Sequence, residues 1–303
     1  MSDEALIQKI LKLKKERDAV ILAHNYQIGE VQDIADFTGD SLGLSIEASK
    51  TKAKVIVFCG VRFMAETTAI ICPDKTVIVP DENAGCPMAN MITVRQLKEV
   101  KNRYPNAKVV CYVNSTAAVK AESDICCTSA NAVKVVNSIP KENDIIFVPD
   151  KSLGDFVSKK SDRKMILWEG YCPTHHSILA QDIINMKAKY PNAKVIVHPE
   201  CTSDVVELAD EALSTSGMCK YARESDAKEF IVGTEIGLLH TLRKENPDKK
   251  FYPASRLADC PNMKLNTLEK ILWSLEDMVY EVTVPEDIRV KAWDTIDKML
   301  KLV

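Results

Sequence analysis

An internal repeat constrains the fold of this chain more than any other feature of its sequence. The heptapeptide YPNAKVV that begins at Tyr104 returns almost unchanged as YPNAKVI at Tyr190, 86 residues later. Cys86 and Cys172 are also 86 residues apart, each 18 residues before one of these tyrosines, and Cys260 follows Cys172 by 88 residues. A fixed period of this kind indicates a supersecondary unit that is used several times. Three units of about 86–88 residues fill most of the 303-residue chain.

Each unit has the same predicted order of helices and strands. An amphipathic helix comes first, and its expected ranges are 3–17, 93–103 and 177–189. A short apolar run typical of a buried parallel strand follows, and a second such run comes after further helices. Strands that alternate with helices predict parallel sheets joined by right-handed crossovers. We therefore expect an α/β protein of three pseudo-threefold-related three-layer αβα domains with short parallel sheets.

The period also sets the expected domain boundaries. The first αβα repeat is placed at residues 1–86, the second at 87–172 and the third at 173–264. The remaining segment, 265–303, has the pattern of a helix, a strand-like VYEVTVP and a closing helix. We expect this segment to pack back onto the first repeat.

Composition and charge exclude several classes of protein. Apolar residues make up 46% of the chain and charged residues 27%, which is usual for globular domains and excludes disordered and fibrous classes. The net charge is −3, so nothing marks a surface for nucleic acid or an anionic membrane. The N-terminus lacks the apolar core of a signal peptide, and no apolar run approaches the roughly 20 residues of a membrane span. We expect a cytoplasmic protein with no nucleic-acid or membrane partner.

Polar side chains follow the first predicted strand of each repeat at one fixed phase. These side chains are His24 and Tyr26, Tyr112 and Asn114, and His198 and Glu200. The two members of each pair are two residues apart, so both point to one face of an extended segment. Open α/β sheets bind their ligands at the carboxyl ends of the strands. We therefore expect the active site on the central axis between the three repeats.

A hydroxyl residue stands fifteen positions after the second member of each pair, and these residues are Ser41, Ser129 and Thr215. Each opens a helical pattern and is a candidate N-cap, where free backbone N–H groups favour a phosphate or a carboxylate. Three such helix starts at one axis suit a small substrate with several anionic groups. His175, which follows Cys172 closely, is a further candidate for the site.

Three of the ten cysteines recur at the 86–88-residue spacing of the repeat, and we call Cys86, Cys172 and Cys260 the phased cysteines. The other seven do not recur at this spacing. A cytoplasmic chain keeps its thiols reduced, and the C-x-x-C motif of zinc ribbons and redox dithiols is missing from the sequence. Three converging thiolates, at Cys86, Cys172 and Cys260, hold either a structural zinc with a fourth ligand or an iron–sulfur cluster. A [4Fe–4S] cluster on three thiolates leaves one iron open to act as a Lewis acid. The remaining cysteines are expected to be small core residues: Cys59, Cys72, Cys111, Cys126, Cys127, Cys201 and Cys219.

Several short motifs occur in order along the chain. They are AHNYQ at 23–27, DIADFTGDSL at 33–42, GVRFMAET at 60–67, YVNSTA at 112–117, TSAN at 128–131, HPEC at 198–201, STSGM at 214–218 and FYPA at 251–254. Together they resemble the quinolinate synthase family, and the resemblance runs from about residue 18 to beyond Cys260. That family joins iminoaspartate to dihydroxyacetone phosphate, releases phosphate and water, and makes quinolinate for NAD biosynthesis.

The resemblance implies a ligand set, a reaction and partners. It places a [4Fe–4S] cluster on the three phased cysteines, and it makes Tyr26, Glu200, His24 and His198 the candidates for proton transfers in a dehydrating condensation. The partners would be the two small substrates, and a transient contact with the enzyme that supplies iminoaspartate stays open. The residues that would bind substrate are His24, Ser41, Tyr112, Asn114, Ser129, His175, His198, Glu200 and Thr215.

Two other functions fit part of the same pattern. Other threefold-symmetric proteins with a three-cysteine cluster reduce diphosphates or cleave S-adenosylmethionine. Few basic residues stand near the strand ends, Arg62 and Lys151 being the nearest, so a diphosphate site has little support. A zinc-stabilised scaffold would use the same three cysteines and would need no open coordination position. The iron content of the purified protein distinguishes this zinc scaffold from a quinolinate synthase and from the other cluster enzymes.

Overall fold

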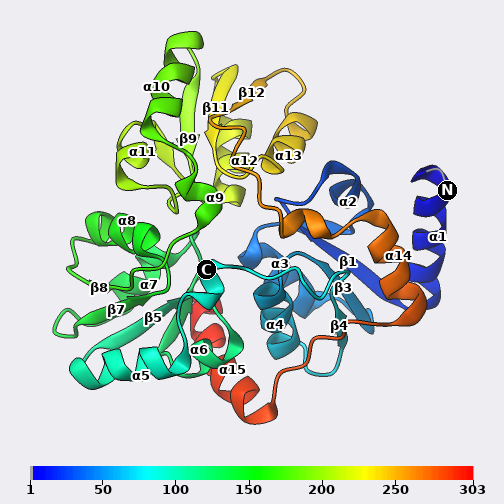
Figure 1. Ribbon diagram of the computed structural model, residues 1–303, viewed down its shortest axis with the longest axis horizontal. Coiled ribbons are helices and arrows are strands. Elements are labelled where there is room, and N and C mark those ends of the chain that lie inside the picture. The colour runs from blue at the N-terminus through cyan, green and yellow to red at the C-terminus, as the bar shows by residue number, and fades with distance from the viewer. Residues whose placement is uncertain (1–2, 303) are drawn as a thin grey trace.

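The computed structural model describes residues 3–302 and shows three α/β units arranged around a common centre (Figure 1). Each unit contains one four-stranded parallel sheet. Helices lie on both sides of these sheets, so the predicted α/β class and the three-layer αβα architecture are confirmed. Residues 1, 2 and 303, which the predicted domains include, lie outside the described residues.

The elements follow the predicted order. The first unit has α1 (Asp3–Glu16), β1 (Ala19–His24), α2 (Gly29–Ile34), β2 (Phe37–Gly39), α3 (Ser41–Lys50), β3 (Val55–Cys59), α4 (Arg62–Ile71) and β4 (Thr76–Ile78). The second has the 3-10 helix η1 (Met88–Asn90), α5 (Val94–Arg103), β5 (Lys108–Tyr112), α6 (Ala117–Ala121), β6 (Ile125–Cys127), α7 (Ala132–Ser138), β7 (Ile145–Val148), α8 (Lys151–Ser161) and β8 (Ile166–Leu167). The third has α9 (Pro173–His176), α10 (Ala180–Lys189), β9 (Lys194–Val197), α11 (Ser203–Glu207), β10 (Glu211–Ala212), α12 (Thr215–Glu224), β11 (Glu229–Gly233), α13 (Leu238–Glu245) and β12 (Lys250–Pro253). The C-terminal segment adds the 3-10 helix η2 (Met263–Leu265), α14 (Leu268–Asp277) and α15 (Glu286–Leu300).

All three sheets have the same strand order. The orders are β2-β1-β3-β4, β6-β5-β7-β8 and β10-β9-β11-β12. In each sheet the first strand of the unit therefore lies between the second and the third, and the chain reverses its direction of travel across the sheet at that point. Such a switch point opens a crevice at the carboxyl ends of the strands. The fold thus provides one crevice for each unit.

The central strands form because their sequences are apolar on both faces. β3, with the sequence VIVFC, is buried along its whole length, and so is β7 with IIFV. β-Branched and aromatic residues favour extended backbone, and helices on both faces of a parallel sheet make an uninterrupted apolar run the stable choice.

Three aspartates repeat a structural contact with the period of the chain. Asp36, Asp124 and Asp210 precede the second strand of each unit, 88 and 86 residues apart. The Oδ2 atom of each accepts a hydrogen bond from a backbone N–H of the first strand, at 2.8 Å in every unit. Since the same spacing relates the polar strand-end residues, the period governs the framework as well as the site.

The C-terminal segment divides between two units. α14 packs on α1 and β3 of the first unit, where Leu268 and Leu275 join a buried cluster with Leu6 and Ile10. α15 packs instead on α6 and β6 of the second unit and reaches α4 of the first (Figure 1). The expectation that the whole of 265–303 covers the first unit therefore differs from the structure for α15. Ala292, Ile296 and Met299 of α15 belong to the same buried cluster as Val119 of α6 and Cys126 of β6.

The strand expected in VYEVTVP is only a single antiparallel bridge between Ile78 and Glu281. Tyr280 has a φ of 62°, which an extended strand does not allow. The segment therefore crosses the edge of the first sheet without becoming a fifth strand. Among the described residues, no helix combines the length and the apolar character that a membrane crossing requires.

Candidate functional site

One central pocket receives side chains from all three units. It encloses about 970 Å³, its open mouth included. Every residue that the sequence singled out for the site lines this pocket: His24, Tyr26, Ser41, Cys86, Tyr112, Asn114, Ser129, Cys172, His175, His198, Glu200, Thr215 and Cys260. The strand order gives each unit a crevice, and the arrangement of the three units around a common centre brings these crevices together (Figure 1).

Two histidines occupy equivalent strand ends in the first and third units. The Nδ1 atom of His24 accepts a hydrogen bond from the backbone N–H of Tyr26 at 3.2 Å, and Nδ1 of His198 accepts one from that of Glu200 at 3.3 Å. Burial lowers the pKa of both imidazoles to about 3, against the opposing charge of Glu200. Both rings are therefore neutral near pH 7, and Nε2 carries the remaining proton as a hydrogen-bond donor.

The buried Glu200 carboxylate has close polar contacts with three side chains. Its Oε1 accepts from the Tyr112 hydroxyl at 2.5 Å and from Asn114 Nδ2 at 3.2 Å, while Oε2 lies 2.7 Å from His175 Nδ1. Burial alone raises the pKa of this carboxyl group, but His175, His198 and the donated hydrogen bonds outweigh burial and hold the pKa well below its usual range. Glu200 is thus a carboxylate with donors on both oxygens.

The two pocket tyrosines are held in the protonated form. Burial, followed by the negative charge of Glu200, raises the pKa of Tyr26 and of Tyr112 well above that of a free phenol. Each can therefore donate a hydrogen bond or a proton, whereas a phenolate would be costly in this pocket.

The three phased cysteines face the pocket from equivalent loops. Cys86, Cys172 and Cys260 follow the last strand of their units and are half-buried. The other cysteines are all buried, as expected for small core residues. Burial raises the pKa of the Cys86 thiol to about 12, so this group is not an anionic nucleophile by itself. A bound metal deprotonates a coordinating thiol outright, which makes metal binding the chemistry these thiols suit.

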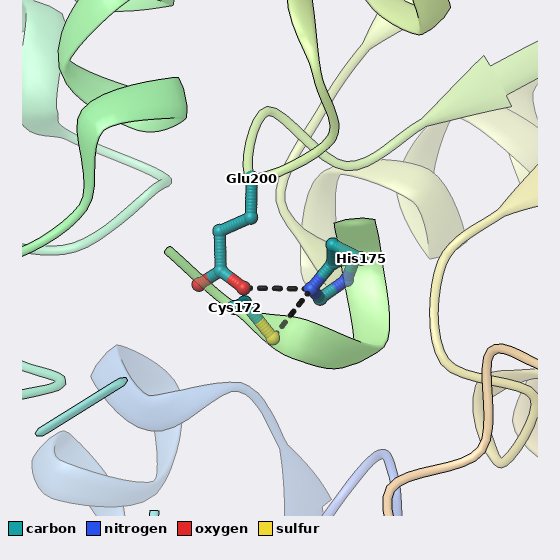
Figure 2. A group of neighbouring side chains, drawn as sticks. All are labelled: Cys172, His175 and Glu200. Atoms are coloured by element: carbon teal, nitrogen blue, oxygen red, sulfur yellow. Dashed lines mark hydrogen bonds and ion pairs between the residues drawn. The ribbon is translucent and has the colours of Figure 1, made fainter. Parts of the chain in front are cut away.

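A smaller group of possible metal ligands was not expected. Figure 2 shows Cys172, His175 and Glu200 side by side, and one ligand atom from each lies within 4.8 Å of the others. His175 Nδ1 is 3.2 Å from the Cys172 sulfur and also faces Glu200 (Figure 2). A single ion here would have to displace the contact between His175 and Glu200.

The hydroxyl residues differ from the N-caps that the sequence predicts. The caps of α3 and α12 are Asp40 and Ser214, so Ser41 and Thr215 are the first helical residues, and Ser129 lies three residues before α7. Asp40 and Ser214 accept the N–H groups of Gly43 and Gly217, which is the role assigned to their neighbours. The candidate hydroxyls are consequently free for other partners: Ser129 accepts from His198 Nε2 at 3.2 Å, and Thr215 accepts from Asn25 Nδ2 at 3.0 Å.

Glu235 is a pocket residue that sequence reasoning missed. It follows β11, its Oε1 accepts the backbone N–H of Cys260 at 3.1 Å, and it pairs with Lys264 at 2.8 Å. Lys264 also donates to the backbone carbonyl of Tyr26, so the Cys260 loop is tied to the first unit. The repeat gives no clear signal for this position, because the residues at the same place after the third strands of the first and second units are Val61 and Asp150.

A close approach between the first and third units makes Gly237 sensitive to substitution. A Cβ atom at this position would lie 2.7 Å from the Tyr26 backbone and 2.8 Å from Glu235 Oε2. Gly237→Ala should therefore lower the free energy of unfolding by about 1–3 kcal/mol, as overpacking does. Chemical denaturation tests this, with Gly39→Ala as the control, because the nearest atom to that Cβ would be 3.8 Å away. Equal stability of the two variants would show that the contact between the first and third units can shift to accept the added methyl group.

Comparison with known proteins gives one consistent result. The family model described as quinolinate synthetase A protein matches residues 8–301. The chain is 59% identical over 303 residues to the quinolinate synthase of Dehalococcoides mccartyi, with 100% of both chains covered. It is 58% identical over 300 residues to that of Methanosarcina barkeri, covering 99% of this chain and 98% of the relative. The quinolinate synthase of Geobacter metallireducens is 59% identical over 302 residues, with 100% and 99% covered.

Proposed function

Because this chain belongs to the quinolinate synthase family, we propose that it condenses iminoaspartate with dihydroxyacetone phosphate to quinolinate, with release of phosphate and water. We further propose that it uses a [4Fe–4S] cluster held by Cys86, Cys172 and Cys260, and that it acts in NAD biosynthesis in the cytoplasm. The observation that carries the proposal is the convergence of the phased residues from three units on one pocket.

The three phased thiols, all among the described residues, are not grouped as closely as a single zinc ion requires. Zinc at about 2.3 Å from each sulfur keeps two sulfurs within about 4.6 Å of each other. Among residues 3–302, the one set of three potential ligand atoms within 4.8 Å of one another includes Cys172 but neither Cys86 nor Cys260. When bound on three thiolates, a [4Fe–4S] cluster supplies an iron with an open position that acts as a Lewis acid towards a hydroxyl or carbonyl oxygen.

The hydroxyl residues and neutral histidines would hold the anionic parts of the substrates. Ser41 and Thr215 stand at the first turns of α3 and α12, where backbone N–H groups are free for a carboxylate or phosphate. His24 and His198 add N–H donors that need no positive charge.

Proton transfers in imine formation, tautomerisation and ring closure need an acid and a base in the pocket. Glu200 is the carboxylate that would accept a proton, and its contacts with Tyr112 and His175 hold it in place. Tyr26 keeps its proton near neutral pH and would donate it to a departing oxygen. Both side chains line the pocket, so each can reach a bound substrate.

Ser129 allows substrate binding to be separated from helix capping. Ser129→Ala should raise the KM for dihydroxyacetone phosphate with little change in stability, because this hydroxyl caps no helix. Ser214→Ala should lower the free energy of unfolding by about 0.5–2 kcal/mol, since it removes the cap of α12. Steady-state kinetics and denaturation of both variants give the answer. An unchanged KM in Ser129→Ala would remove this hydroxyl from the binding site.

The proposed reaction is tested directly by incubating anaerobically purified protein with both substrates and measuring quinolinate by mass spectrometry. We expect quinolinate and phosphate in equal amounts. Turnover of a diphosphate or of S-adenosylmethionine, without quinolinate, would contradict the proposal and support the other cluster enzymes.

A further inference from the structure

The segment that carries Cys86 to the pocket is held by polar contacts rather than by regular structure. We call residues 79–86 the Cys86 loop; all of them are described, and they form neither a strand nor a helix. Asp81 in this loop is 9% exposed, and its Oδ2 lies 2.5 Å from Nζ of Lys270 on α14. We propose that Lys270 is a positioning residue that holds the Cys86 loop in the shape that presents its thiol to the pocket. The consequence for a metal cluster rests on the proposed function.

Asp81 is the residue that gives the loop its shape. Its Oδ1 accepts the backbone N–H of Asn83 at 2.8 Å, and its carbonyl oxygen accepts that of Ala84 at 3.2 Å. The buried Ala84 in turn accepts the backbone N–H of Arg62, at the start of α4, at 2.8 Å. A carboxylate that binds the N–H two residues further on forms a local turn. Lys270 occupies the other carboxylate oxygen, so the Asp81 side chain is fixed at two points.

The charge of Asp81 depends on the same contacts. Burial raises the pKa of this carboxyl group, but the hydrogen bonds from Lys270 and Asn83 outweigh burial and hold the pKa below its usual range. Asp81 is therefore a carboxylate near neutral pH, and Lys270 is the cation that compensates its charge.

α14 by itself gives no reason for a lysine at this position. Its N-cap is Thr267, so Lys270 is the third helical residue, where the positive end of the helix dipole disfavours a cation. A Glu or Gln at this place would complete a capping box with Thr267. The contact with Asp81 explains the lysine, whereas the stability of the helix does not.

The Cys260 loop contains a comparable device. Lys264 pairs with the buried Glu235 at 2.8 Å, and Glu235 accepts the backbone N–H of Cys260 at 3.1 Å. Lys264 and Lys270 both belong to the C-terminal segment that follows the three repeats. This one segment thus supplies a lysine to the loops of two phased cysteines.

The Cys86 loop also supports the third thiol. It leads directly into η1, after which the Met91 carbonyl accepts the indole N–H of Trp168 at 3.0 Å. The Met91 sulfur accepts the backbone N–H of Tyr171, the residue before Cys172, at 3.3 Å. A shift of the Cys86 loop should therefore reach the Cys172 loop through η1.

Lys270→Met tests the ion pair, because it keeps most of the length of the side chain and removes the charge. Hydrogen–deuterium exchange of residues 79–86 is measured by mass spectrometry on anaerobically purified protein. We expect the Asn83 and Ala84 amides to exchange at least about fivefold faster, because the loop opens more often when Asp81 loses a partner. This factor is low for a charge-assisted hydrogen bond, since Lys270 is partly exposed and water replaces part of the contact. Lys270→Arg keeps a cation that fits a carboxylate and should restore the exchange rates.

The rate of iron release to an excess of a ferrous chelator is the second readout. Lys270→Met should release iron at least about fivefold faster as well, because Cys86 leaves the cluster through the same local opening. Asp81→Asn keeps an acceptor for Asn83, loses the charge, and should behave in the same way. The double variant should be no worse than either single one, because both residues act through one contact.

Lys14→Met is the matched control. Lys14 Nζ lies 2.6 Å from Asp36 Oδ1, both side chains are partly buried, and Asp36 also accepts a backbone N–H, but neither residue lines the pocket. We expect it to lower the free energy of unfolding without changing loop exchange or iron release.

Wild-type rates of loop exchange or of iron release in Lys270→Met would overturn the inference. So would the same changes in Lys14→Met, or an equal rise of exchange along the whole chain of Lys270→Met, because each would show a general loss of stability. A wild-type protein without iron would overturn the proposed function instead, and exchange of residues 79–86 would then decide the role of Lys270 alone.

Discussion

Replacement of Cys86, Cys172 or Cys260 by alanine should abolish both iron binding and quinolinate formation. Each half-buried thiol reaches the central pocket from a different unit, so none of the three can substitute for another. A cluster held by two protein thiolates has two exposed irons and is expected to be lost during purification. Iron analysis and anaerobic turnover of each variant measure the two effects.

Cys59→Ala and Cys219→Ala are the matched controls for the cysteine variants. Both residues are buried thiols that do not line the pocket, one on β3 and the other on α12. We expect full iron content and nearly full activity from both, with only a modest loss of stability from the small cavity. Retention of the cluster after loss of one phased cysteine would show that the ligand set is wrong.

Glu200→Gln should lower turnover by at least about a hundredfold, the lower end of a general acid–base contribution. The amide keeps the shape of the side chain but removes the charge and one acceptor. Tyr112 and His175 both donate to the carboxylate, so the new NH₂ group must face one of these donors. The variant should fold and bind iron normally. Rapid-quench kinetics measures the loss.

Glu229→Gln provides a comparison for Glu200→Gln. Glu229 also accepts a hydrogen bond from a tyrosine hydroxyl, that of Tyr252 at 3.1 Å, but it stands at the start of β11, outside the pocket. Its turnover should equal that of the wild type. Near-normal turnover in Glu200→Gln as well would mean that another group accepts the proton.

The repeat made most of the framework predictable from sequence. The first strands, the polar residues that follow them and the phased cysteines recur at fixed spacing, because all three units pack the same order of strands and helices. Asp36, Asp124 and Asp210 obey the same rule, although only the structure revealed their contact with the first strand. Features that repeat in all three units can thus be predicted from the sequence alone.

Features that break the threefold symmetry were not predictable in this way. Glu235 stands where the other units have Val61 and Asp150, so the repeat does not mark it, and its importance comes from its contacts with Cys260 and Lys264. The packing of α15 on the second unit likewise depends on which surface is left uncovered, and an amphipathic pattern does not encode that choice. The predicted N-caps of α3 and α12 were wrong by one residue, because the side chains of Asp40 and Ser214, and not those of Ser41 and Thr215, accept the free backbone N–H groups.

The metal content of anaerobically purified protein tests the central claim most directly. The account predicts a brown protein with about four irons per chain, the content of one [4Fe–4S] cluster. A colourless protein with one zinc per chain, whether at the three phased cysteines or at Cys172, His175 and Glu200, would contradict it.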